Sequence, residues 1–426
     1  MLLVGFCFVI LPGNHNLIIM KKLFLFFFSV STLTAFAQKE NTVHPEKDLR
    51  MSVLPYYNFG KGLGLTSPDS IFQLNIRFRM QNRATYVHSG DQEEDRISAE
   101  IRRLRLRFDG YVGNPKFKYA IQLSFAPGDT GGAIEEGKNM QIIRDAVFFY
   151  QPNESWTFSF GQTKLPGNRQ RVNSSGALQF TDRSINNASF TIDRDFGVQV
   201  HHLNEYKDKF SYNFKGAITT GEGRNDTQNS DTGLAYTGKV ELFPLGSFTN
   251  NGSYFEGDLA RETTPKIMLS GAYSYNHKAT KSQGQLGSTL FEKRDLKSVF
   301  IDAMLKYNGW AFQSAYMSRA ADDPITVNPV DAGDIEFAYV GEGMDYQLSY
   351  LFPSHFEVLG RYSYQNMHKD IAALAPDRKQ YSFGVTKYIW EHAFKMQAEV
   401  TYDEFEYLGG NTANGWYVRF QIEMGI

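Results

Sequence analysis

The sequence predicts an all-β protein, a closed antiparallel transmembrane β-barrel of about sixteen strands. Three observations indicate this fold class: an N-terminal export signal, segments in which apolar and polar residues alternate strictly, and connections that are short and long in turn. The chain contains 37 Gly, 24 Tyr and 35 Phe, yet its mean hydropathy is −0.39. After Ala37 no stretch approaches the roughly 20 apolar residues that a membrane helix needs.

Residues 1–37 have the features of a targeting region. A basic start, an apolar stretch and a small-residue cleavage site follow one another as Lys21-Lys22, 23–30 and 35–37. We therefore predict initiation at Met20, an upstream extension over 1–19, and cleavage after Ala37. Export of a chain with this composition favours the outer membrane of a Gram-negative bacterium.

Composition narrows the function classes. The formal net charge is −2, which argues against a nucleic-acid-binding protein. The single cysteine, Cys7, lies in the targeting region, so no disulfide framework or thiolate chemistry is expected in the mature chain. Residues 38–70 contain prolines and glycines and are expected to form a periplasmic lead-in. The barrel itself is predicted over 71–426.

The strand segments show the alternation of a wall that is apolar on one side and wet on the other. In 416–426, the stretch WYVRFQIEMGI, every second residue is apolar and most of the others are polar. The same period of two recurs in 72–81 and in 116–125. Because successive strand side chains point to opposite faces, this pattern predicts membrane-barrel strands.

The connections alternate in length, as in an antiparallel barrel with both termini on one side. Short turns are predicted at 113–115, 152–154, 204–208, 308–309, 353–354 and 391–392, and longer polar loops at 89–97, 127–139, 161–193, 220–232, 278–294, 321–338, 368–377 and 406–413. The connection 244–265 is long where a short turn is due. Residues 334–352 fit either one strand with a bulge or two strands.

Arginines gather on one face of two neighbouring strands. Leu104, Leu106 and Phe108 are expected to face lipid, so the alternate positions Arg103, Arg105 and Arg107 should face the lumen. Arg77 and Arg79 take the same face of the preceding strand. Since same-face neighbours lie roughly 7 Å apart, within the Debye length of about 8 Å, their potentials overlap. The strip predicts attraction of anions, and the repulsion between its members must be offset by carboxylates, water or a passing anion.

The longest loop, 161–193, is predicted to fold inward and narrow the pore, because a lumen of this size is an aqueous channel. Basic residues outnumber acidic ones in and next to it, and Ser174 and Ser175 supply hydroxyls that can donate to an oxyanion. The basic residues are Lys164, Arg169, Arg171, Arg183 and Arg194, against Asp182, Asp193 and Asp195.

An outer-membrane hydrolase is an alternative function for such a barrel. A barrel hydrolase would need a histidine beside a nucleophile, and the candidates near loops are His88 with Ser89, His277 and His368. The chain has no G-x-S-x-G or H-E-x-x-H motif, so no catalytic residue is predicted. His201-His202 lack recognisable partners for a metal, so neither a metal site nor a cofactor is expected. A general diffusion pore without anion preference stays open.

Several motifs resemble the phosphate-selective porin O and P family of Gram-negative bacteria. They are Gly161-Gln162, Lys164, Pro166, Ser174-Ser175, Leu178, Phe180, Arg183-Ser184, Asn187-Ala188, Arg194 to Gln199, Arg102-Arg103 with Arg105, Arg144 to Ala146, Gly221 to Asn225, and Phe243 to Gly246. The resemblance implies a sixteen-strand barrel, usually trimeric, with an inward third loop and an arginine-lined wall that guides small anions of the phosphate class.

The resemblance also implies which residues form the anion site. They are Arg77 or Arg79, Arg102 or Arg103, Asp145, Arg171, Ser174, Ser175 and Arg183. Strand alternation favours Arg103 over Arg102. Lipid and lipopolysaccharide are the expected surroundings, and the acidic loop of Asp91, Glu93, Glu94 and Asp95 could meet divalent cations there.

Overall fold

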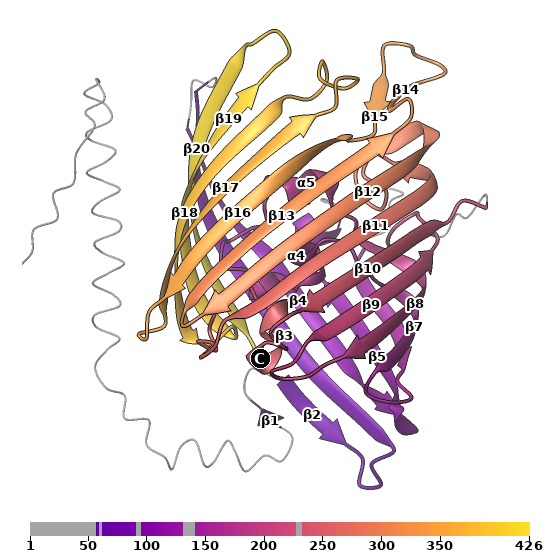
Figure 1. Cartoon of the computed structure of the whole chain (residues 1–426). Helices are drawn as coiled ribbons and strands as arrows, with labels where there is room; N and C mark the ends of the chain where they lie inside the picture. Colours follow the sequence, from indigo (N-terminus) through magenta and orange to yellow (C-terminus); the bar gives the residue numbers. More distant parts are fainter. Residues whose placement is uncertain (1–56, 59–61, 91–94, 131–140, 227–231) are drawn as a thin grey trace, which may run out of the picture. The chain divides into compact units, whose positions relative to one another are not determined.

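The computed structural model describes residues 57–58, 62–90, 95–130, 141–226 and 232–426. The chain divides into two units, Met1–Tyr57 and Asn58–Ile426. The predicted targeting region and most of the predicted lead-in lie outside the described residues. The second unit contains the barrel (Figure 1). None of the described helices is long and apolar enough to cross a membrane.

Sixteen antiparallel strands form a closed barrel, which confirms the predicted fold class. The first eight wall strands are β3 (Phe72–Ser89), β4 (Arg96–Val112), β5 (Asn114–Ser124), β6 (Ile143–Tyr150), β7 (Trp156–Lys164), β8 (Arg194–Asn204), β9 (Ser211–Thr219) and β10 (Ala235–Phe243). The others are β11 (Lys266–Lys281), β12 (Thr289–Tyr307), β13 (Trp310–Ala321), β16 (Gly341–Leu351), β17 (Phe356–Met367), β18 (Asp377–Trp390), β19 (Phe394–Glu406) and β20 (Thr412–Gly425).

The seam of the barrel joins β20 to β3. Their register runs from Gly415↔Ser89 to Gly425↔Arg79, so both strands are paired on both sides along this stretch. Below it, the short strand β2 (Gly62–Thr66) pairs with the first residues of β3. Closure matters because a free strand edge in lipid would leave backbone amides and carbonyls without partners. The two-residue strand β1 (Tyr57–Asn58) precedes β2.

The strand boundaries follow the predicted alternation of turns and loops. The region 334–352, which fitted one strand or two, contains two: β15 (Ile335–Phe337) pairs with β14 (Ile325–Val327) in a separate hairpin, and β16 belongs to the wall. The β11–β12 hairpin continues to Lys281 and Thr289, so that loop is shorter than predicted.

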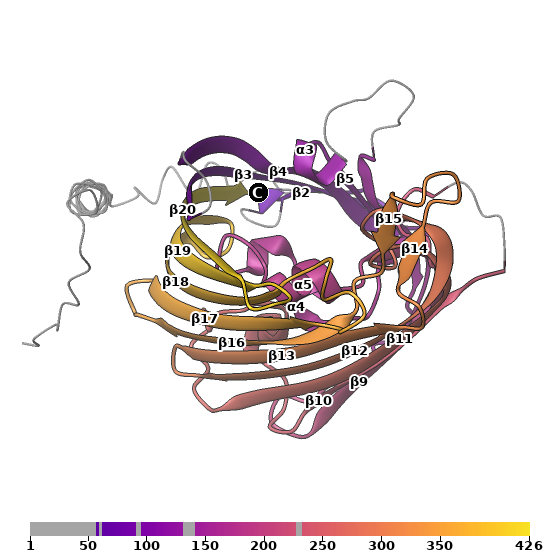
Figure 2. The same cartoon turned by 90° about the horizontal axis from the view of Figure 1, so that it is seen from above.

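Three connections contain helical turns among the described residues. The β7–β8 connection, 165–193, holds α4 (Arg169–Val172), η1 (Ser175–Ala177) and α5 (Ile185–Phe190), and the β10–β11 connection holds η2 (Thr249–Tyr254). Ser174 and Ser184 cap η1 and α5, because their hydroxyl oxygens accept from backbone N–H groups of the following turn. Seen from above, α4 and α5 lie within the ring of strands (Figure 2). A further helical turn, α3 (Pro127–Thr130), follows β5.

An apolar cluster fixes the two ends of segment 165–193 to the inner wall. Leu165, Phe190 and Ile192 pack against Phe300 of β12 and Met317 of β13, and all five side chains are buried. Full burial of a side chain of this size contributes about 1.5–3 kcal/mol. The segment therefore begins and ends in apolar contacts with the wall, although most of its other buried side chains are polar.

Candidate functional site

The arginines of β3 and β4 face each other across one ladder. The register places Arg77 opposite Arg107 and Arg79 opposite Arg105, with Gln81 opposite Arg103. Arg79 donates to the hydroxyls of Ser174 and Ser175 at 3.1 and 2.5 Å. Since these serines belong to the segment inside the barrel, the Arg79 side chain faces the interior.

Carboxylates offset the repulsion within this strip, as its charge requires. Arg77 and Arg107 share Asp109. Arg105 donates to Asp129 of α3 at 2.6 Å, and the same carboxylate lies 3.0 Å from Arg144 of β6. The central arginines are therefore held in buried ion pairs.

A β-bulge adds an arginine that strand alternation alone would place outside. The β3–β4 register shifts between Gln81 and Asn82, whose partners are Arg103 and Ile101, so Arg102 is the extra residue. As a result Arg102 and Arg103 both reach Asp182, at 3.1 and 3.5 Å. Strand alternation favoured Arg103 over Arg102, and the bulge brings both side chains to this carboxylate.

Asp182 is the centre of a cluster of cations. Besides Arg102 and Arg103, Arg83 of β3 lies 2.7 Å and Arg419 of β20 lies 3.7 Å from its carboxylate. Arg83 and Arg419 were not among the predicted site residues. Their alternation with apolar neighbours places them on the inner face, but only the position of Asp182 inside the barrel brings them into the site.

The charge state of this cluster should not change near neutral pH. Burial alone would raise the pKa of the Asp182 carboxyl, but the guanidinium groups of Arg102, Arg83 and Arg103 outweigh it and hold that pKa well below its ordinary value. Because the folded-state pKa is the lower one, the stabilisation that Asp182 provides is complete above the unfolded value of about 3.9 and is lost only as pH falls below it. We expect the difference in unfolding midpoint between the unmodified protein and an Asp182→Asn variant to stay constant from pH 8 to pH 5. A difference that disappears with a midpoint near pH 6 would contradict this assignment.

A second charged cluster joins the ends of segment 165–193 to β6. Arg194 lies 2.9 Å from Asp145 and 3.4 Å from Asp193, and Arg171 lies 2.8 Å from Asp193. Thr163 donates a further hydrogen bond to Asp145 at 3.3 Å. Of the residues that the sequence assigned to the site, Asp145 and Arg171 thus lie in one network.

Lys164 and Arg183 hold the backbone of the inner segment. The Lys164 ammonium donates to the carbonyls of Val172 and Asn173 at 2.7 and 2.9 Å. Arg183 donates to the carbonyls of Gln170 and Asn173 at 2.7 and 3.0 Å. Both cations therefore satisfy carbonyls at the end of α4, where positive charge is favourable.

The charged layer consists of the interior arginines and carboxylates around Asp182, Asp129 and Asp193, and several of its donors have no hydrogen-bond partner among the described residues. They include the Nε groups of Arg103, Arg144, Arg224 and Arg419 and the Nη1 group of Arg224, all of them buried. A buried N–H without an acceptor is costly, so such groups favour an acceptor that comes from outside the chain, such as water or an anion.

Polar contacts anchor segment 165–193 to strands on the far side of the barrel. Its Thr181 donates to Glu399 of β19 at 2.9 and 2.8 Å, through its N–H and its hydroxyl. At the other end, Arg319 of β13 donates to three successive carbonyls of the segment, those of Ser189, Phe190 and Thr191. The wall makes room for it at Gly343, where an added Cβ would meet Asn186 Oδ1 at 1.9 Å.

The alternative candidates lie near the loops. His88, His277 and His368 each contact an aspartate, at 2.6, 2.9 and 3.2 Å, in exposed pairs. His88 contacts Asp95, while the rest of the predicted acidic loop, 91–94, lies outside the described residues. Within the described ranges, no group of three or more His, Cys, Asp or Glu side chains could hold a metal ion.

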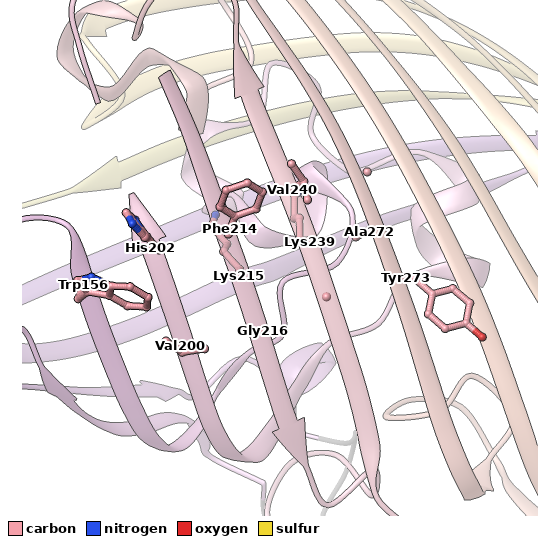
Figure 3. A pocket seen from close by; sticks show the side chains of 12 residues that line it. Trp156, Val200, His202, Phe214, Lys215, Gly216, Lys239, Val240, Ala272 and Tyr273 are labelled. Atoms are coloured by element: carbon pink, nitrogen blue, oxygen red, sulfur yellow. The ribbon is translucent and has the colours of Figure 1, made fainter. Parts of the chain in front are cut away.

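A depression on the outer face of the wall is lined mainly by apolar side chains, in contrast to the charged interior. It spans β7 to β11 and is lined by apolar side chains, among them Val200, Phe214 and Val240 (Figure 3). Gly216 pairs with Gly238 at its floor. Because these residues alternate with buried inner ones such as Lys215 and Lys239, the depression lies on the side away from the charged layer.

Comparisons with known proteins agree with this architecture. A family model described as phosphate-selective porin O and P matches residues 74–350. The outer membrane channel DcaP of Acinetobacter baumannii is 14% identical with a TM-score of 0.54, over 85% of this chain and 99% of that one. OmpF of Salmonella typhi, in a complex with daunomycin, is 13% identical with a TM-score of 0.50, over 84% of this chain and 100% of that one. These two likenesses concern the fold. No curated protein matches the sequence.

Proposed function

Because this chain belongs to the phosphate-selective porin O and P family, we propose that it conducts small anions of the phosphate class through the charged interior of its barrel. The family and the barrel make it a porin of the outer membrane. Anion selectivity is the part that we infer from the site, and the observation that carries it is the excess of arginines around single carboxylates.

The electrostatics favour anions over cations. Four arginines lie within 4 Å of Asp182 and two lie within 4 Å of Asp129. Arg83 and Arg419 also reach Glu100 and Glu399, so six arginines face four carboxylates. A water-filled passage whose wall carries an excess of one charge concentrates ions of the opposite charge.

We propose that segment 165–193 forms the constriction and presents the serines to the passing anion. The oxygen of Ser175 accepts from Arg79 and Arg105, at 2.5 and 3.1 Å, and the oxygen of Ser174 accepts from Arg79. The hydroxyl hydrogen of Ser174, whose side chain is exposed, is then left to donate to an oxyanion. Ser175 is 3% exposed and holds the two arginines in place. Arg171 and Arg183 supply positive charge from the same segment.

A planar-bilayer experiment tests this function. With a tenfold gradient of potassium chloride across the membrane, we expect a reversal potential of the sign that chloride permeation gives. Phosphate added in steps should lower chloride conductance as it competes for the same passage. A reversal potential set by potassium would refute the proposal, and one near zero would support a general diffusion pore.

Three further expectations complete the proposal. We expect a homotrimer in detergent solution, to be measured by light scattering, in contact with lipid and lipopolysaccharide in the membrane. We expect a mature N-terminus at Gln38, to be measured by N-terminal sequencing. We expect conduction to need no cofactor, so a dialysed protein should conduct as well as an untreated one.

A further inference from the structure

The β10–β11 connection, 244–265, is the turn that the sequence marked as unusually long. Its middle contains η2, where Asn250 and Asn251 adopt positive φ of 51° and 55°. Asparagine tolerates this left-handed conformation better than most residues. After η2 the chain carries three acidic side chains that are almost completely buried: Glu256, Asp258 and Glu262. A turn exposed to the periplasm would not bury carboxylates in this way.

The burial comes from contacts with segment 165–193. Glu256 donates its backbone N–H to Ala177 O at 3.2 Å, and its carboxylate accepts from the N–H of Gln179 at 2.8 Å and from Gln170 Nε2 at 3.1 Å. In return, Arg169 of α4 donates to the carbonyl of Phe255 at 2.5 Å. The two connections, which leave the barrel wall at opposite ends of their strands, therefore meet inside it.

The same connection is also bonded to the inner wall. The ammonium of Lys306 on β12 donates to the carbonyls of Gly252, Phe255 and Gly257, at 2.7, 3.1 and 2.6 Å. The Phe255 ring stacks on that of His392, with centroids 4.5 Å apart. All three donors of the ammonium are thus used by one turn of backbone, which orders it strongly.

Exposure of the inner side chains differs between the two sides of the barrel. Behind the two connections, Lys306, Glu357 and Lys395 are 1%, 0% and 0% exposed. On β3 and β4, the side chains of Arg77 and Arg107 are 40% and 42% exposed, whereas those of Arg103 and Arg105 are 4% and 9% exposed. Accessible interior surface is therefore found beside the parts of β3 and β4 that carry Arg77 and Arg107, and the inner side chains named on β12, β17 and β19 are covered.

We propose that the connection 244–265 is a periplasmic insert that supports segment 165–193 from the periplasmic side of the barrel. Together with that segment it occupies the part of the lumen next to strands β12 to β19. Anions then pass only beside β3 and β4, where the exposed arginines are. This inference rests on the proposed conduction of anions. It assigns Glu256 as a positioning residue, since it acts by holding segment 165–193.

The first test removes most of this insert. Replacing 248–262 with Asn-Gly should raise the single-channel conductance about twofold or more and reduce anion selectivity, because the covered half of the lumen becomes accessible. Glu256→Ala should shift both quantities in the same direction by less. Glu205→Ala, in an exposed periplasmic turn, is the matched control and should conduct as the unmodified protein does. Heat-modifiable migration in SDS gels establishes that each barrel is folded.

The second test does not depend on conduction. In a Cys7→Ser background, a cysteine at Glu256→Cys should react with a membrane-impermeant maleimide at least tenfold more slowly than one at Glu205→Cys.

Glu256→Gln, which keeps one acceptor oxygen, should conduct more like the unmodified protein than Glu256→Ala does. Equal labelling rates, or an unchanged conductance after removal of 248–262, would overturn the inference. A channel without anion preference but with slow labelling would refute the proposed selectivity and leave the insert in place.

Discussion

Replacing Asp129 with alanine should destabilise the barrel by about 3–5 kcal/mol, because removal of one partner leaves buried charges uncompensated. Asp129 accepts from Arg105 Nε and Nη2 at 3.0 and 2.6 Å and from Ser124 Oγ at 2.7 Å, and it lies 3.0 Å from Arg144 Nη1. The measurement is urea unfolding in detergent or liposomes, followed by tryptophan fluorescence.

The same substitution at an exposed aspartate is the control, because it removes a carboxylate without uncovering buried charges. Asp322→Ala removes an aspartate whose side chain is 93% exposed and lies 3.8 Å from Lys297. Exposed ion pairs contribute little, so its unfolding midpoint should match that of the unmodified protein. If Asp129→Ala and Asp322→Ala unfolded alike, Asp129 would not hold the arginine strip together.

Neutralising three partly exposed arginines in or beside segment 165–193 should abolish most of the anion preference. Arg79, Arg102 and Arg171 have side chains 17%, 23% and 18% exposed, so each can meet an ion in water. A charge at contact distance in a water-like medium contributes about 1 kcal/mol, or about a fivefold change in relative permeability. The triple Arg→Gln variant should therefore lower the anion-to-cation permeability ratio by well over tenfold, as measured from reversal potentials.

The matched control removes three cations from exposed positions outside the charged layer. Lys116, Lys118 and Lys209, each changed to Gln, lower the net charge equally and should leave the reversal potential unchanged. An equal shift in both triple variants would mean that overall charge, and not the interior layer, sets selectivity. Arg103 and Arg105 are poorer targets than the sequence suggested, because both are buried in ion pairs and their loss should impair folding.

Much of the fold follows from local patterns. The alternation in 416–426 and 72–81 is repeated at every pair of residues, because each strand faces lipid on one side and a polar interior on the other. Turn residues such as Asn308-Gly309 mark the ends of strands locally as well. The sixteen-strand count could therefore be predicted without knowing any contact between distant residues.

The site depends on contacts that local patterns do not contain. The bulge at Arg102 is set by the pairing of β4 with β3, and a shift of one residue moves a side chain to the other face. Arg83 meets Asp182 across 99 residues of sequence. The burial of 249–262 depends on where two connections end inside the barrel, and the only available signal was the unusual length of 244–265.

The polar anchors of segment 165–193 also constrain the order in which the molecule can be built. Its partners Asp345, Glu357 and Glu399 come 161, 178 and 218 residues after the groups that they bind. Contacts between residues so distant in sequence form slowly, since the whole intervening chain must be arranged first. A hairpin that forms early offers no partners to segment 165–193. The polar groups of this segment must therefore stay hydrated until strands β16, β17 and β19 have formed. The packing of segment 165–193 inside the barrel is thus coupled to closure of the barrel wall. A partly formed barrel therefore has no defined channel.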